Sequence, residues 1–207
     1  MQKLILKKYN KMLNLPIQPR YILPPLLLIL FSTIFAALDL NNLLEFNRTL
    51  VNKGELWRIF TSQFVHANWA HLGLNISGIF LIWLLHGEYT TPTRYFLNTI
   101  TLALWCGLGV YFYCPDIHIY TGLSALLHGV IIWGAVKDIT QGLKSGYLLF
   151  IGVWVKIAYE QLSGPSADIG ELINSTVAID AHLIGAIGGS LLGIELVIKY
   201  YKNRAKG

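Results

Sequence analysis

The chain has 207 residues, of which 54% are hydrophobic and only 13% charged, and its mean hydropathy is +0.52. A soluble domain of this size needs more charge to cover its surface, so the composition indicates that the chain is embedded in lipid. The net charge of +5 does not indicate a nucleic-acid partner, because the basic residues gather at the chain ends and in loops, where membrane topology places them.

Six apolar runs follow one another along the chain, and each predicts a membrane-spanning helix. The predicted spans are about 21–40, 69–87, 93–113, 122–139, 145–162 and 178–199. Pro24 and Pro25 fall in the first turns of the first span, where proline is tolerated. The expected fold class is therefore an all-α integral membrane protein, a bundle of six transmembrane helices that leaves no room for a second folded domain.

The distribution of Lys and Arg predicts the orientation of the bundle. The long loop at 41–68 and the inside of the fifth span hold four basic residues, and the other twelve lie on the opposite side. Those twelve are Lys3, Lys7, Lys8, Lys11, Arg20, Arg94, Lys137, Lys144, Lys199, Lys202, Arg204 and Lys206. The positive-inside rule places the basic tails at 1–20 and 200–207 in the cytoplasm, with the domain at 21–199 between them and the long loop outside.

The first apolar run and the two cysteines of the third predicted span each have a simple interpretation. The first apolar run is long enough to span a membrane and Phe35-Ala36-Ala37 is a poor cleavage site, so we expect a retained anchor and not a cleaved signal peptide. Cys106 and Cys114 lie eight residues apart on one predicted helix, about 12 Å along its axis, which is too far for a disulfide. No Cys or His spacing indicates zinc, and we expect neither a metal nor a cofactor.

Ser124 lies at the start of the fourth predicted span, directly after a short loop that contains Gly122. Helix N-termini carry unpaired N–H groups and the positive end of the helix dipole, which favour an alkoxide or oxyanion beside that hydroxyl. The alternative is that Ser124 only caps the helix.

His182 lies at a similar depth at the start of the sixth predicted span. Gly185, Gly189 and Gly193 follow it at intervals of four, a stripe of small residues that permits close helix contact. An imidazole beside a serine hydroxyl accepts its proton as the oxygen attacks a carbonyl, so the pair predicts nucleophilic catalysis. The alternative is a hydrogen-bonded polar residue at a helix interface.

His71 and Asn75 are four residues apart on the second predicted span and therefore share one face. Both side chains donate hydrogen bonds, which a tetrahedral oxyanion requires. The alternative is a pair of interfacial residues that anchor the end of the helix.

Together these motifs resemble those of the rhomboid proteases and occur in rhomboid order. They are Trp57-Arg58, His71-x-x-x-Asn75, Gly122-x-Ser124 and Ala181-His182-x-x-Gly185-x-x-x-Gly189. The resemblance runs from about residue 54 to 193 and is strongest to the rhombosortase branch. The features shared with that branch are Gln63-Phe64-Val65-His66, Gly122-Leu123-Ser124-x-x-Leu127-His128-Gly129, Lys156 with Glu160-Gln161, and Ala178-x-Asp180-Ala181-His182.

This resemblance implies an intramembrane serine protease with Ser124 as nucleophile and His182 as general base and acid. It implies that His71 and Asn75, with the backbone N–H of Ser124, form the oxyanion hole. The rhomboid pattern that this chain resembles has a catalytic dyad of serine and histidine, so no acidic residue is expected as a third member. They usually have glycine after the serine where this chain has Ala125, which puts the fit of the substrate backbone in doubt.

Four further residues are candidates for a supporting role. His128 replaces a tyrosine that packs on the catalytic histidine in many rhomboids, and is expected either to hydrogen-bond to His182 or a water or only to fill space. Lys156 and Glu160 are four apart on the fifth span and predict an ion pair, for structural positioning or for substrate contact. Asp180 is expected to join that pair.

The resemblance also implies a location and a substrate class. The protein is expected in a bacterial inner membrane with its active site open to the periplasm. Substrates would be exported proteins with a C-terminal signal made of a Gly-Gly motif, one hydrophobic helix and a basic tail. The alternatives are an inactive rhomboid-like protein that binds transmembrane helices and a small transporter, although the chain shows no inverted repeats.

Overall fold

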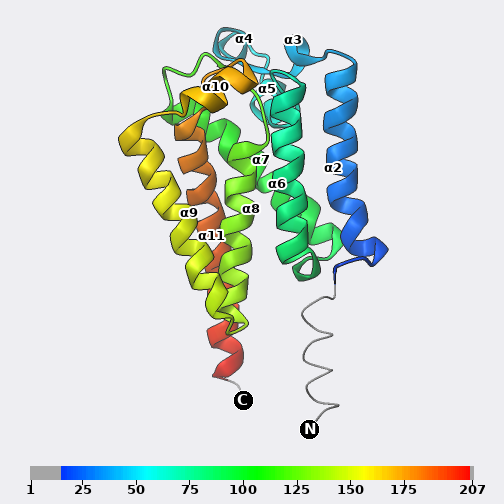
Figure 1. The fold of residues 1–207 in the computed structure, drawn as a ribbon, viewed down its shortest axis with the longest axis vertical. Helices are drawn as coiled ribbons and strands as arrows, with labels where there is room; N and C mark the ends of the chain where they lie inside the picture. Colours follow the sequence, from blue (N-terminus) through cyan, green and yellow to red (C-terminus); the bar gives the residue numbers. More distant parts are fainter. Residues whose placement is uncertain (1–14, 206–207) are drawn as a thin grey trace.

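The computed structural model describes residues 15–205, in which six long helices run side by side (Figure 1). The helices are α2 (Pro19–Ala37), α6 (Trp69–His86), α7 (Pro92–Tyr113), α8 (Ser124–Thr140), α9 (Lys144–Ser163) and α11 (Ile179–Arg204). The start of α2 and the end of α11 lie at the same end of the bundle. Several of the basic residues used to predict the orientation (Lys3, Lys7, Lys8, Lys11 and Lys206) lie outside the described residues.

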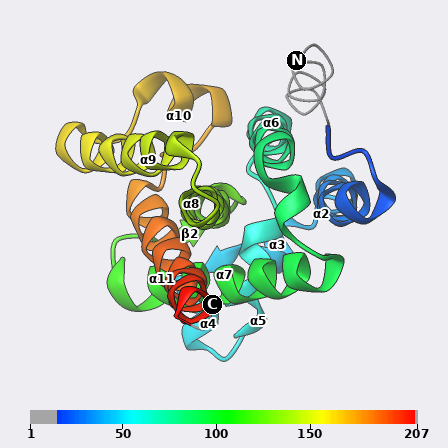
Figure 2. The ribbon, with the colours of Figure 1, turned by 90° about the horizontal axis from the view of Figure 1, so that it is seen from below.

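Helix α8 lies at the centre of the bundle, as Figure 2 shows in a view along the helices. Ten of its 17 residues are buried, from Ala125 to Asp138, whereas only Gly146 and Ile157 are buried in the 20 residues of α9. Helix α11 packs most extensively on α8, which also contacts α6, α7 and α9. Ser124 at the start of this buried helix is itself half-buried.

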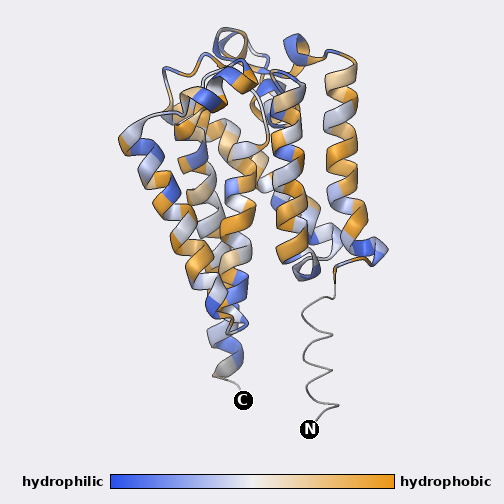
Figure 3. Ribbon diagram, in the orientation of Figure 1, coloured by the Kyte–Doolittle hydropathy of each residue, from blue (hydrophilic) through white to orange (hydrophobic). Residues whose placement is uncertain are grey.

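The predicted all-α membrane fold is confirmed. By length and composition, four helices in the described part of the chain are able to cross a membrane: Pro19–Ala37, Trp69–Tyr89, Pro92–Tyr113 and Ile179–Asn203. Helix α8 is shorter, and α9 carries Lys156 and Glu160 in its second half. Apolar residues dominate the long helices while hydrophilic residues gather toward the ends (Figure 3). Six long helices are compatible with six spans, and that count stays a prediction.

The segment predicted as a long loop contains several short elements, which lie at the end of the bundle opposite to the start of α2 (Figure 1). They are α3 (Asn41–Leu44), β1 (Phe46–Asn47), α4 (Arg48–Asn52), α5 (Trp57–Thr61) and η1 (Ser62–Phe64). Strand β1 pairs antiparallel with β2 (Ile119–Tyr120), the segment that leads into α8. This two-residue ladder ties residues 41–68, the outer segment, to the turn before Ser124.

Two arginines hold these outer elements by donating to backbone carbonyls. The buried Arg58 donates to Glu45 and Asn42 and forms an ion pair with Glu55 at 2.7 Å. Arg48 donates to four carbonyls at and after the end of α7, those of Val110, Tyr111, Cys114 and Ile117. Helix ends leave backbone carbonyls without an intrahelical partner, and the two arginines supply donors to such carbonyls at the ends of α3 and α7.

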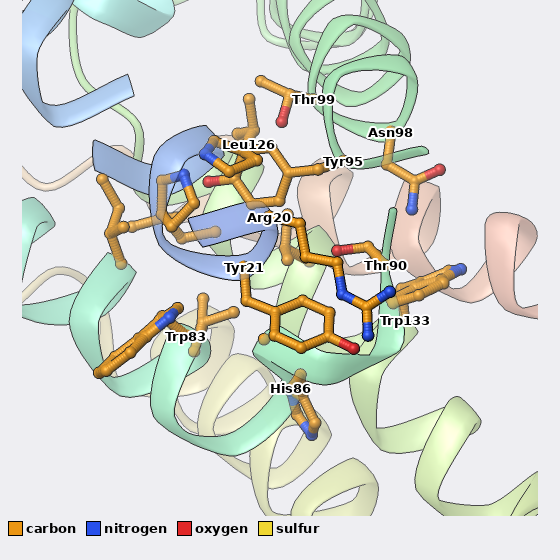
Figure 4. Close-up of a pocket in the computed structure, with 17 residues that line it drawn as sticks. Arg20, Tyr21, Trp83, His86, Thr90, Tyr95, Asn98, Thr99, Leu126 and Trp133 are labelled. Carbon is orange, nitrogen blue, oxygen red and sulfur yellow. The ribbon is translucent and has the colours of Figure 1, made fainter. Parts of the chain in front are cut away.

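The opposite end of the bundle has its own polar contacts and a small cavity of about 40 Å³ (Figure 4). Asp138 near the end of α8 accepts hydrogen bonds from His86 of α6 and Tyr89 of the 3-10 helix η2 (Gly87–Tyr89). Arg20 and Tyr21 of α2 are among the residues that line the cavity beside His86. These contacts join α2, α6 and α8 far from Ser124, and they involve none of the predicted site residues.

Candidate active site

The turn before α8 presents the Ser124 hydroxyl to His182. Leu123 is the N-cap of α8 and no side chain caps the helix, so Ser124 does not act as a cap. Its Oγ instead lies 3.0 Å from Nε2 of His182. Gly122 has φ +109°, and a Cβ there would lie 2.6 Å from the His71 imidazole, so the turn requires glycine. Its N–H donates to the Ser62 carbonyl at 3.0 Å, which anchors the turn to η1.

The glycine stripe of α11 allows its backbone to touch that of α8. A Cβ on Gly185 would lie 1.8 Å from the carbonyl oxygen of Ala125, and one on Gly189 would lie 2.1 Å from that of Gly129. The two helices can approach this closely only because the residues at these positions are glycines, which have no side chain. This close approach of the two helices is what holds His182 within hydrogen-bond distance of Ser124.

His71 and Asn75 of α6 lie across a cavity of about 110 Å³ that Ser124 and His182 also line. Both side chains are buried, which does not fit residues that anchor a helix in a membrane interface. Nδ1 of His71 and the amide nitrogen of Asn75 have no hydrogen-bond partner in the described protein. Leaving a buried polar group unpaired costs about 1–3 kcal/mol, so such groups call for an explanation. Donors held ready for an oxyanion provide one.

The loop before α6 packs on the same region. His66 is buried, and its ring lies edge-on to that of His71 with centroids 5.1 Å apart. Burial, reinforced by the neighbouring His71, lowers the pKa of His66 to about 3, so the imidazole is neutral. Asn41 donates to the His66 carbonyl at 2.7 Å, and Trp57 donates to that of Leu43 at 3.2 Å. The Trp57-Arg58 motif thus supports the site indirectly through the outer segment.

His128, Lys156 and Glu160 gather beside His182. The His128 ring stacks on the His182 ring with centroids 4.3 Å apart, and its Nδ1 lies 2.7 Å from the Ser124 carbonyl oxygen. Of the alternatives for His128, a hydrogen bond to His182 is not formed, and the two rings stack instead. The Lys156 ammonium lies 2.8 Å from a Glu160 oxygen, as the predicted ion pair requires, and 2.8 Å from Nε2 of His128.

The expectation that Asp180 joins this ion pair is wrong. Its side chain is exposed, neither Lys156 nor Glu160 makes a hydrogen bond or ion pair with it, and its charge lies near the Cys114 thiol after α7. The carboxylate that reaches His182 is that of Glu160, 3.1 Å from Nδ1. Asp180 precedes His182 by two residues, which on a helix turns the two side chains about 200° apart.

A short helix over the site had no counterpart in the predicted spans. Helix α10 (Ala167–Ile173) lies between α9 and α11, and its Ile169 and Ile173 line the same cavity as Ser124. Asn68, the N-cap of α6, donates to the carbonyl oxygen of Leu172 at 3.0 Å and ties α10 to α6. The pattern Ser166 followed by Asp168 is a helix-start signal that the sequence carried.

Three side chains are close enough to hold a metal ion, namely His128, Glu160 and His182, whose nearest ligand atoms all lie within 4.8 Å of one another. Each of them already has a partner in the protein. The Lys156 ammonium lies 2.8 Å from both His128 and Glu160, so a fixed cation occupies the position next to two of the three ligands. The two nitrogens of His182 face Ser124 and Glu160.

Comparison with known proteins identifies the family of the chain. The rhomboid domain family matches residues 53–199, a region that starts in the outer segment and runs to the end of the bundle. A search of curated proteins found no match. The family is generally one of intramembrane serine proteases, and the matched region contains Ser124, His182, His71 and Asn75. Because the match covers well over half of the chain, this protein belongs to the rhomboid family.

Proposed function

We propose that this protein is an intramembrane serine protease in which Ser124 is the nucleophile and His182 the general base and acid. The observation that carries the proposal is the 3.0 Å contact between Ser124 Oγ and His182 Nε2. This contact lies at a cavity that is also lined by His71 and Asn75, each of which has a buried nitrogen without a hydrogen-bond partner in the described protein. A nucleophile, a base within hydrogen-bond reach and donors for the oxyanion are the parts that acyl transfer requires.

The proposed reaction begins when Ser124 Oγ bonds to the carbonyl carbon and its proton passes to His182 Nε2. The tetrahedral oxyanion accepts hydrogen bonds from His71, Asn75 and the backbone N–H of Ser124. Cleavage of the C–N bond sends the His182 proton to the leaving amine and leaves an ester on Ser124. Water, or an amine of a lipid head group, then attacks the ester, and its proton returns through His182 to Ser124.

The substrate is proposed to be a membrane-anchored chain whose scissile bond lies near one end of a hydrophobic helix. A groove of about 470 Å³ extends from Ser124 between α6 and α9, and its lining is almost entirely apolar. Such a groove suits an apolar segment that enters from lipid beside the nucleophile. In line with the rhombosortase resemblance, the preferred substrate would carry a Gly-Gly motif, one hydrophobic helix and a basic tail at its C-terminus.

The proposed location is a bacterial inner membrane with both termini in the cytoplasm and Ser124 near the periplasmic face. The basic residues of α11 near its C-terminal end support this orientation, because Lys199 and Lys202 lie at the end of the bundle away from Ser124. Substrates released there would be exported proteins whose folded part lies outside the cell.

A fluorophosphonate probe on the purified protein tests the proposal directly. The probe is expected to label the wild-type chain, and labelling is expected to vanish in Ser124→Ala and in His182→Ala while both variants keep the wild-type melting temperature. Cleavage of a single-span reporter with a Gly-Gly motif should be lost in the same two variants. Gly73→Ala is a matched control, since a Cβ there meets nothing within 4 Å.

The outcomes separate the candidate functions. Absence of labelling and cleavage in a folded wild-type protein would favour a rhomboid-like protein that only binds transmembrane helices. Near-normal turnover in either variant would show that the reaction does not use this pair. Equal cleavage of reporters with and without the Gly-Gly motif would remove the rhombosortase-like specificity and leave the protease.

A further inference from the structure

His182 uses both of its ring nitrogens in contacts with other side chains. Nε2 lies 3.0 Å from Ser124 Oγ, while Nδ1 lies 3.1 Å and 3.3 Å from the two oxygens of Glu160. An ionised carboxylate only accepts hydrogen bonds, so Nδ1 carries the proton in this arrangement and Nε2 keeps its lone pair. That is the tautomer that accepts the Ser124 proton.

We propose that Glu160 is a positioning residue for His182, so that this protease works with a Ser124–His182–Glu160 triad. The inference rests on the proposed function and departs from the dyad that the family resemblance implies. In such a triad the acid does not take the proton. It holds the imidazole in the reactive tautomer and orientation, and it stabilises the imidazolium that forms during attack.

Lys156 and His128 hold Glu160 and His182 in place. The His128 Nδ1–H donates to the Ser124 carbonyl at 2.7 Å, which leaves Nε2 of His128 to accept from the Lys156 ammonium at 2.8 Å. The same ammonium contacts Glu160 at 2.8 Å. The imidazole of His182 is therefore fixed on its face by the stacked His128 ring and on its Nδ1 edge by Glu160.

The burial of these groups explains why the acid needs a cation. The side chains of His182 and Glu160 are 6% and 15% exposed, and a lone carboxylate at such a site would be costly to ionise. Lys156, which is 46% exposed, balances the Glu160 charge from the side of the groove. The network is neutral at rest, and the one positive charge added during catalysis appears on His182 beside the carboxylate.

The test is the isosteric substitution Glu160→Gln, assayed by steady-state cleavage of a single-span reporter. The glutamine amide can donate to Nδ1, which favours the tautomer with the proton on Nε2 and leaves Ser124 without an acceptor. We expect kcat to fall at least about 10²-fold with KM within twofold, because acid loss in a triad costs up to about 10⁴-fold. Glu160→Asp, which keeps the carboxylate, should recover at least tenfold over Glu160→Gln.

The matched control is Glu195→Gln on α11. Glu195 also pairs with a lysine four residues away, Lys199, and with Arg94, yet it lies near the opposite end of that helix from His182. Its kcat should stay within twofold of wild type. A fall in Glu195→Gln equal to that in Glu160→Gln would mean that loss of any such ion pair lowers activity, and the triad would be rejected.

The remaining outcomes distinguish the triad from the proposed protease itself. If wild-type protein neither labels nor cleaves, the proposed function fails. If it is active and Glu160→Gln keeps kcat within threefold, the triad is overturned and the dyad stands. Should Glu160→Gln fold poorly, the double variant Lys156→Met/Glu160→Gln leaves no unpaired charge. A stable, inactive double variant supports the triad, and near wild-type kcat overturns it.

Discussion

Replacing Gly185 with alanine is expected to damage stability and catalysis together. The added methyl carbon would lie 1.8 Å from the Ala125 carbonyl oxygen, 1.6 Å short of the 3.4 Å at which ordinary contact begins. The obstacle is backbone, so no side-chain rotation relieves it and α11 must move away from α8. Overpacking typically costs about 1–3 kcal/mol, and a backbone clash belongs at about 3 kcal/mol, or roughly a 10 °C fall in Tm for a chain of this size.

The same displacement acts on the contact between Ser124 and His182, which we propose to be catalytic. Ser124 immediately precedes Ala125, and its hydroxyl is 3.0 Å from His182, so a shift of about 1 Å exceeds the range of a good hydrogen bond. Misplacement by about 1 Å costs on the order of 10²-fold in rate. We therefore expect kcat to fall by at least that factor, with a larger loss for valine at the same position.

The assay is reporter cleavage in detergent beside a thermal melt followed by tryptophan fluorescence. Gly73→Ala on α6, where a Cβ meets nothing within 4 Å, should leave kcat unchanged and should not lower Tm, because alanine favours a helix over glycine. A Gly185→Ala protein with wild-type Tm and wild-type kcat would refute the close packing of α8 on α11. Wild-type Tm with lost activity would show that the glycine serves catalysis without holding the helices together.

Three further predictions follow from the site. His71→Ala and Asn75→Ala should each keep partial activity, a loss of about 10²–10³-fold in kcat with wild-type Tm, because other oxyanion donors remain; unchanged kcat in both would assign them a structural role. Lys156→Met and Glu160→Gln should each destabilise the protein more than the double variant does, with a coupling of about 1 kcal/mol because Lys156 is 46% exposed; additive effects in a double-mutant cycle would mean no interaction. Gly122→Ala should lose at least about 10²-fold in kcat, because alanine is strained at φ +109° and its Cβ would lie 2.6 Å from the His71 imidazole, so the turn must move. Full activity in this variant would show that the turn does not support the proposed oxyanion donors.

The sequence was sufficient to predict the helices and several candidate site residues. Hydrophobic runs predicted all six long helices to within five residues at either end, because a span must satisfy its backbone internally and present an apolar surface. The elements within 41–68 were not predicted beyond a loop. Their arrangement depends on hydrogen bonds from Arg48 and Arg58 to backbone carbonyls that are distant in sequence. The local pattern of hydrophobic residues gives no indication of such hydrogen bonds.

The pairing of Ser124 with His182 was also foreseeable, because both start helices that run in the same direction and α11 carries the glycine stripe. The short contacts of Gly185 and Gly189 with α8 give the physical basis for that expectation. The resemblance already indicated that the side chain at position 128 lies against His182, but it did not decide between a hydrogen bond and ring stacking. The relative orientation of the two rings depends on the rotation of α11 about its own axis, which the backbone contact between α8 and α11 sets.

The choice of the acid beside His182 shows where sequence reasoning stops. The sequence predicted an ion pair of Lys156 with Glu160, joined by Asp180 two residues before His182, and it predicted no acid beside His182 itself. Within one helix, the number of residues between two positions determines the angle between their side chains. Asp180 and His182 are two residues apart, so the Asp180 side chain points away from that of His182 and is exposed. Glu160 reaches His182 only because α9 and α11 both pack on α8. The sequence by itself thus determined the residue types and the helices that carry them, whereas the tertiary packing of the helices decided which carboxylate contacts the imidazole.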